Sequence, residues 1–141
     1  MRIESLDHLV LTVSDLRASI GFYVSVLGMR ELRFGKDPAT GEARTALAFK
    51  DAKINLHVAG REIRPCAAAP TPGSADLCLL VASPIEEVVA ELEAAGVPIE
   101  LGPVERTGVT GPILSVYVRD PDANLIELSA PISAEGGADL R

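Results

Sequence analysis

Short apolar runs alternate with polar segments along the chain, and the order of these runs repeats once. Each copy opens with a stretch rich in Leu and Val, at residues 6–13 and 74–81, which predicts a buried strand. Apolar residues at helical spacing follow in both copies, and a glycine, Gly28 or Gly96, ends each of them. The matching order predicts two copies of one structural unit.

Both predicted helices are preceded by residues that favour a helix start. Ser14 and Asp15 precede the first helix. In the second copy, Ser83 is expected to cap the helix, Pro84 to occupy its first position and Glu86 to complete a capping box.

Three further strands are expected in each copy, which makes each copy a β-α-β-β-β unit. The strands are 30–34, 44–49 and 54–59 in the first copy and 98–101, 113–118 and 125–129 in the second. The expected loops are 35–41 and 102–111, and the expected polar turns are 50–53 and 119–124.

The predicted fold class is therefore α+β, with two βαβββ modules in tandem. One such module of ~65 residues buries too little surface to be secure alone, so the two together form a single domain over residues 1–141. Its parts are module 1 (3–60), a Pro- and Ala-rich linker (61–73), module 2 (74–131) and a loose tail (132–141).

Composition narrows the function classes. Hydrophobic residues make up 48% of the 141 residues, enough for a packed core. Thirteen Lys and Arg against twenty Asp and Glu give a net charge of −7, which argues against binding to nucleic acid or to an anionic membrane. The N-terminus shows no signal peptide, and the longest apolar runs are far shorter than a membrane span, so we expect a cytoplasmic protein.

The two cysteines provide neither a disulfide framework nor a four-thiolate zinc site. Cys66 lies in the linker, where we expect it to be exposed. Cys78 lies in an apolar strand and is expected to be a small buried side chain, with a soft metal ligand as the alternative.

A known family shares this pattern. The two βαβββ modules, the histidine two residues after Leu6 and the closing string Arg-Asp-Pro-Asp-Ala-Asn-Leu-Ile-Glu (119–127) together resemble the vicinal-oxygen-chelate superfamily. This superfamily includes glyoxalase I, bleomycin and fosfomycin resistance proteins, methylmalonyl-CoA epimerase and extradiol dioxygenases. The resemblance covers about residues 3–131. Residues 53–57, 72–79 and 102–108 resemble the glyoxalase-domain-containing protein 5 branch.

The resemblance implies paired mixed sheets that form an open half-barrel trough, one divalent metal ion and a homodimer. Each module is expected to supply one ligand from its first strand and one from its last. The corresponding residues are His8 and Asp76, then His57 and Glu127. Imidazole and carboxylate suit Zn, Ni, Mn or Fe. Glyoxalase-I-like members of the superfamily usually have histidine where Asp76 stands, so Asp76 is expected either to bind the metal directly or to orient a ligating histidine.

Each of these residues also has a structural interpretation. His8 shares a strand face with apolar residues and is then a core histidine, and His57 forms a surface pair with Asn55. Glu127 and Asp76 lie in apolar stretches, where a buried carboxylate needs a cation, an arginine or several hydrogen-bond donors.

The leading hypothesis is a metal-dependent enzyme that binds a small substrate through two neighbouring oxygens, with lyase, isomerase or dioxygenase chemistry. Glu127 is the candidate general base. Ser115 and Tyr117 are expected to line the substrate site from one strand face. Arg106 binds a substrate carboxylate or, alternatively, is a solvated loop charge.

A second hypothesis is a non-catalytic small-molecule or drug-binding protein like those for bleomycin resistance. The acidic composition suits a cationic drug, but the low aromatic content of 4% and the candidate ligands argue against it. A third is a structural domain with a vestigial site.

Overall fold

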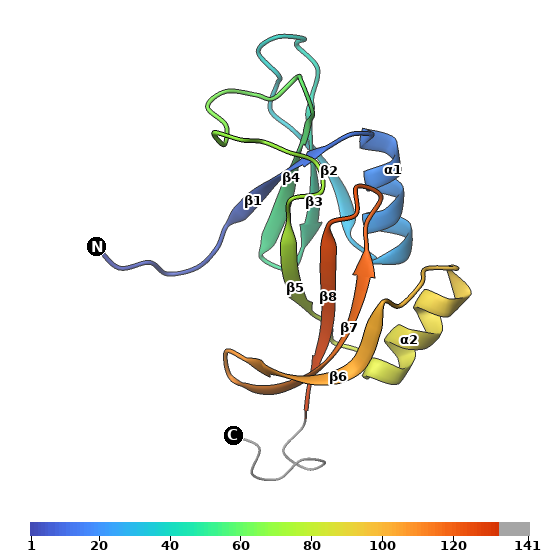
Figure 1. The fold of residues 1–141 in the computed structure, drawn as a ribbon. Coiled ribbons are helices and arrows are strands. Elements are labelled where there is room, and N and C mark those ends of the chain that lie inside the picture. The colour runs from blue at the N-terminus through green and yellow to red at the C-terminus, as the bar shows by residue number, and fades with distance from the viewer. Residues whose placement is uncertain (133–141) are drawn as a thin grey trace. The chain divides into compact units, whose positions relative to one another are not determined.

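The computed structural model describes residues 1–132, and the contacts within the chain divide it into two compact units. The units are Met1–Ala75 and Asp76–Arg141. Each contains one four-stranded mixed sheet and one helical segment (Figure 1). The predicted α+β class with two tandem βαβββ modules is confirmed. Of the predicted tail 132–141, all but Ile132 lies outside the described residues.

The first unit has the strand order β1-β4-β3-β2. β1 runs parallel to β4, and the other pairs are antiparallel. Its elements are β1 (His8–Val13), α1 (Leu16–Gly21), a π-helical segment (Phe22–Val26), β2 (Arg30–Phe34), β3 (Arg44–Phe49) and β4 (Ala52–Val58).

The first helix begins as predicted. Asp15 is its N-cap residue, and Asp15 Oδ1 accepts a hydrogen bond from the backbone N–H of Ala18 at 3.1 Å. The predicted single helix is, however, an α-helix followed by a π-helical segment, within which Tyr23 is completely buried. Gly28, with φ of 74°, follows the segment.

The second unit repeats the arrangement with the order β5-β8-β7-β6. β5 is parallel to β8, and the other pairs are antiparallel. Its elements are β5 (Asp76–Leu80), α2 (Ile85–Ala94), β6 (Leu101–Gly108), β7 (Gly111–Arg119) and β8 (Leu125–Pro131). α2 packs on β7 and β8. Its buried side chains are those of Ile85, Val88 and Leu92.

The predicted capping box of the second helix is wrong. Pro84, with ψ of 149°, is itself the N-cap residue, and no side chain caps the helix. Ser83 therefore lies one position too early for its hydroxyl to cap.

The predicted strand 98–101 and loop 102–111 are also wrong. Residues Leu101–Gly108 form β6, which pairs with β7 across a two-residue turn between Gly108 and Gly111. The Gly and Pro residues imitate a loop in the sequence, but Gly102 has a different role. Its φ is +111°, and a Cβ on it would clash with the carbonyl oxygen of Ser115. Glycine at position 102 thus allows the β6 backbone to approach the backbone of its neighbour β7 closely.

Each sheet has an apolar face and a polar face, because successive side chains of a strand alternate in direction. The apolar faces hold buried residues such as Ile54 in the first unit and Ile126 in the second. The opposite faces, called the polar faces below, carry the predicted site residues. The strand pairing puts His8, Asn55 and His57 on one of them and Asp76, Ser115, Tyr117 and Glu127 on the other.

Candidate functional site

The second sheet brings four of the predicted site residues together on its polar face. Glu127 Oε2 accepts hydrogen bonds from Ser115 Oγ at 2.7 Å and from Ser129 Oγ at 3.3 Å. Tyr117 lies opposite Glu127 on the neighbouring strand, and its hydroxyl accepts a hydrogen bond from Arg106 Nε at 3.0 Å. Glu127 with its two serines and the Tyr117–Arg106 pair thus form two hydrogen-bonded groups on one face of the sheet.

Glu127 is half-buried, with completely buried Ile126 beside it in the chain. The sequence predicted a carboxylate that needs a cation or several donors, and two serine hydroxyls provide part of this need. Both hydrogen bonds go to Oε2, so neither serine occupies Oε1. Ser115 is completely buried, and its Oγ lies 2.7 Å from Glu127 Oε2 and 2.7 Å from Ser129 Oγ.

Two neighbours on β5 differ from prediction. Cys78 lies opposite Glu127 but is exposed, because β5 is the end strand of its sheet. Partial burial and the Glu127 charge nevertheless raise the pKa of the Cys78 thiol, against the lowering effect of its contact with Ser129, so the thiol stays protonated near neutral pH. Asp76 is the first residue of β5 and is exposed, so it is not the buried carboxylate that its apolar neighbours suggested.

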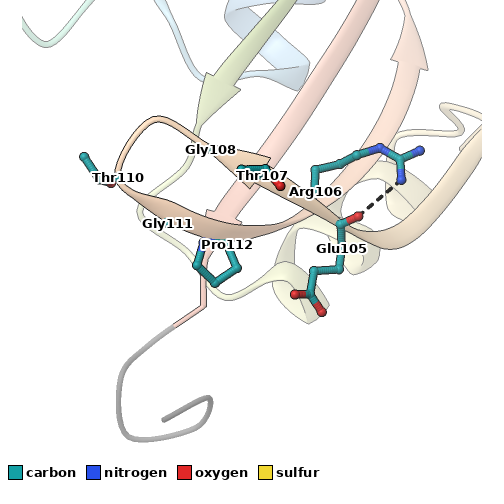
Figure 2. Close-up of a pocket in the computed structure, with 7 residues that line it drawn as sticks. All are labelled: Glu105, Arg106, Thr107, Gly108, Thr110, Gly111 and Pro112. Carbon is teal, nitrogen blue, oxygen red and sulfur yellow. Dashed lines mark hydrogen bonds between the residues drawn. The ribbon is translucent and has the colours of Figure 1, made fainter. Parts of the chain in front are cut away.

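Arg106 belongs to β6 and not to a loop. Besides its bond to Tyr117, its Nη1 donates to the carbonyl oxygen of Glu105 at 3.2 Å (Figure 2). Both residues line an open hollow of about 620 Å³ on the β6–β7 hairpin. The guanidinium is therefore positioned by two partners while it remains exposed.

The first sheet carries the two histidines in very different surroundings. His8 is exposed at the start of β1, and its Nδ1 lies 2.7 Å from Asp7 Oδ1. His57 is only 5% exposed on β4, and neither of its ring nitrogens has a hydrogen-bond partner within residues 1–132. Burial lowers the pKa of His57, Arg44 lowers it further, and Glu62 and Asp37 act in the opposite direction.

The strand register separates these two histidines. His8 lies opposite Lys53, whereas His57 lies four residues further along β4, opposite Thr12. Four residues of a strand span about 13 Å, and the two side chains rise in parallel from one sheet face. The structure therefore does not bring His8 and His57 together.

The register also shows which residues of the two modules are equivalent. Glu127 lies opposite Cys78, two residues after Asp76. In the first sheet, the residue two positions after His8 lies opposite Asn55. The predicted equivalence of His57 with Glu127 is therefore wrong, because Asn55 takes that place. The sequence also indicates that Asn55 and Glu127 are equivalent, because the triplet Ile-Asn-Leu around Asn55 matches the triplet Ile-Glu-Leu around Glu127.

Within residues 1–132, no three His, Cys, Asp or Glu side chains converge on a point suited to a metal ion. The four predicted ligands are divided between the units, with His8 and His57 in the first and Asp76 and Glu127 in the second. Asn55 adds an observation that fits a cation, since its Oδ1 is buried without a hydrogen-bond partner in the described part of the chain.

No helix among the described residues is long and apolar enough to cross a membrane.

Comparison with protein families gives a match over residues 5–128 to the family described as the Glyoxalase/Bleomycin resistance protein/Dioxygenase superfamily.

Individual proteins are similar over most of the chain. Virulence protein STM3117 of Salmonella typhimurium is 53% identical over 129 residues, which are 92% of this chain and 85% of the relative. Its crystal structure has a TM-score of 0.87 at 52% identity and covers 94% of this chain and 100% of that one. Glyoxalase domain-containing protein RDO1 of Mycosarcoma maydis is 48% identical over 92% of this chain and 70% of its own length.

A more distant structure is that of TnmS3, an antibiotic binding protein from Streptomyces sp. CB03234. It is 25% identical, with a TM-score of 0.69, and the match covers 94% of this chain and 99% of that one.

Proposed function

The chain belongs to the glyoxalase/bleomycin resistance protein/dioxygenase superfamily, and we propose that it is a metal-dependent enzyme that binds a small substrate through two neighbouring oxygen atoms. Lyase, isomerase and dioxygenase chemistry share this requirement. The observation that carries the proposal is the Glu127 carboxylate, which two serine hydroxyls hold by one oxygen beside Tyr117 and Arg106.

The proposed ligands are the four equivalent positions of the two modules, His8, Asn55, Asp76 and Glu127. They offer an imidazole nitrogen, carboxylate oxygens and an amide oxygen. Imidazole and carboxylate suit Zn, Ni, Mn or Fe, and among these ions an amide oxygen suits Mn. The unpartnered Oδ1 of Asn55 supports its inclusion, and the register is the reason that His57 is left out. A bound divalent ion supplies polarisation of the substrate oxygens.

Glu127 is the proposed general base. Ser115 and Ser129 hold Oε2, so that Oε1 would accept the substrate proton when Glu127 is not bound to the metal ion. Arg106 is the proposed substrate-binding residue. Tyr117 and the carbonyl of Glu105 engage its Nε and Nη1, which leaves Nη2 to donate to a substrate carboxylate.

Metal content of untagged protein tests the ligand set. We expect about one bound divalent ion per chain, lost in His8→Ala and Glu127→Ala and weakened in Asn55→Ala and Asp76→Ala, because each change removes a donor atom. Glu105→Ala, which removes a carboxylate from β6 at the other edge of the same sheet, is the matched control and should keep its metal. Stoichiometric metal in both His8→Ala and Glu127→Ala would contradict the proposal.

Non-catalytic binding is the second candidate. The open hollow of about 620 Å³ and the likeness to an antibiotic binding protein favour it. A panel of drugs tested by thermal shift, with and without a chelator, separates the two functions. Drug stabilisation that does not change with chelator supports simple binding, since a metal-bridged ligand loses its effect when the ion is removed.

Three narrower expectations remain predictions. Residues 53–57, 72–79 and 102–108 resemble the glyoxalase-domain-containing protein 5 branch, and we propose that the chain belongs to it and acts as a homodimer in the cytoplasm. Light scattering after size-exclusion chromatography tests the dimer, and fractionation of source cells tests the location.

A further inference from the structure

A cavity in the first unit is separate from the residues of the proposed metal site. It has a volume of about 130 Å³. The loop between β2 and β3, the end of β4 and the segment after β4 surround it, and all of its lining residues belong to Met1–Ala75. His57 forms part of its wall.

His57 is the feature that the fold leaves unexplained. The side chain is 5% exposed, and both ring nitrogens lack a hydrogen-bond partner within residues 1–132. An imidazole carries at least one N–H in every protonation state, and a buried donor without a partner costs free energy. A molecule in the cavity that accepts a hydrogen bond would remove this cost.

Two guanidinium groups line the same cavity. Arg44 stacks on the Phe34 ring, with its Cζ 4.9 Å from the ring centroid, and Arg61 is exposed at the rim. Neither guanidinium makes an ion pair or a side-chain hydrogen bond within the part of the chain that the structure describes. Both remain available to an acceptor, and Arg forks match the two oxygens of a carboxylate.

Two acidic residues, Asp37 and Glu42, also line the cavity. Their electrostatic repulsion of a bound anion is weaker than two full charges would give. Asp37 Oδ1 accepts the backbone N–H of Ala39 at 2.8 Å, so this carboxylate belongs to its own turn. Glu42 is exposed to solvent, where its charge is screened. Among the charged groups, Arg44 acts most strongly on His57.

We propose that this cavity binds the carboxylate group of a small organic acid, with His57 donating one hydrogen bond and Arg44 and Arg61 supplying the charge. A water molecule occupies about 30 Å³ of liquid, so the volume suits an ion of acetate size or the end of a longer acid. The site uses the first unit alone and does not depend on the proposed metal or reaction.

Acetate is the probe, and the chain provides its own reference because it contains only two histidines. In nitrogen-15-labelled full-length protein, acetate is added at constant pH while the ring nitrogens of both are observed by NMR. We expect a saturable shift of the His57 signals with a dissociation constant of about 1 mM, a reasonable limit for so small a ligand. The His8 signals should not move.

Charge variants test the two arginines without disturbing the buried histidine. Arg61→Gln and Arg44→Met should each weaken acetate binding about tenfold or more, because each removes a charge-assisted contact. Arg64→Gln, an exposed arginine of the same segment that does not line the cavity, is the matched control and should bind as the natural chain does.

Three results would overturn the proposal. One is the absence of a His57 shift with acetate up to about 100 mM, roughly a hundredfold above the expected constant. Another is an equal shift with sodium chloride or sodium phosphate at the same ionic strength, which indicates an unspecific anion effect. The third is equal weakening by Arg64→Gln and Arg61→Gln.

Discussion

The two sheets share one topology but surround their central polar residue differently. In the second sheet, Glu127 receives two serine hydroxyl groups. In the first sheet, Asn55 takes the equivalent place, and its Oδ1 has no partner within the described residues. His57, which corresponds to Ser129 by its register, is buried and equally without a partner.

This difference shows that a repeated backbone does not repeat its chemistry. Strand order and register depend on the alternation of apolar residues, which both units keep. The polar faces are free to differ because their side chains contribute little to that pattern. One face gives its carboxylate two internal hydrogen-bond donors, whereas the other leaves buried polar atoms without a partner within the described residues.

The largest expected effects test whether the two apolar faces are equivalent. Ile54 and Ile126 lie opposite Leu9 and Leu77, and both are almost completely buried. We expect Ile54→Ala and Ile126→Ala each to lower the free energy of unfolding by about 2–5 kcal/mol through the cavity that each change leaves.

Because the chain has no Trp, urea unfolding is best followed by circular dichroism. Leu80→Ala, at a residue 66% exposed, is the control and should change stability by less than about 0.5 kcal/mol. If the free energies of unfolding of the two isoleucine variants differ by more than about 2 kcal/mol, the two apolar faces are not energetically equivalent.

The next effect compares the polar faces directly. Ser115→Ala removes the 2.7 Å hydrogen bond to Glu127 and should cost about 1–3 kcal/mol, because a half-buried carboxylate loses a donor. Asn55→Ala, measured on metal-free protein, should cost less, because Asn55 Oδ1 has no hydrogen-bond partner to lose within the described residues. Equal losses in urea unfolding would show that the two faces do not differ in this way.

A smaller effect contrasts the helix starts. Asp15→Ala should destabilise the chain by about 1 kcal/mol, since Asp15 caps the first helix. Ser83→Ala should remain within about 0.5 kcal/mol, because no side chain caps the second helix. Thermal unfolding of both variants measures this difference. A large loss of stability in Ser83→Ala would indicate that Ser83 does cap the second helix, as the sequence predicted.

The smallest effect is a pH dependence specific to the first sheet. The pKa of His57 lies below its ordinary value of 6.5, so the unfolded chain binds more protons than the folded one as pH falls through that range. The contribution of neutral His57 to stability is present above pH 6.5 and is lost below it. His57→Gln should therefore lose less stability than the natural chain between pH 7 and pH 5, and a parallel decline would contradict the shift.

Much of the fold could be predicted, because most strands are short, flanked by turn residues and apolar on one side. The predicted strands 30–34 and 44–49 agree with β2 and β3 at both ends. β6 was missed because Gly102 and Pro103 are local loop signals, whereas its pairing with β7 depends on contacts distant in sequence.

The candidate site divides in the same way. Period-two alternation was sufficient to place Ser115 and Tyr117 on one face. The position of His57 relative to His8 was beyond that argument, because parallel strands joined by a long crossover have no turn to fix their register. The donors to Glu127 were missed for a related reason, since Ser129 becomes important only through its distance to the carboxylate.

The absence of a side chain at Gly102 affects the geometry around Glu127, although Gly102 is not one of its two serine donors. Even a methyl group there would collide with the main chain at Ser115 and push apart two strands that lie in contact. The Ser115 hydroxyl, which donates to Glu127, would then be displaced together with β7. Gly102 thus acts as a spacer between β6 and β7 that helps to set the orientation of the proposed base, and alanine at this position would disturb Glu127 indirectly.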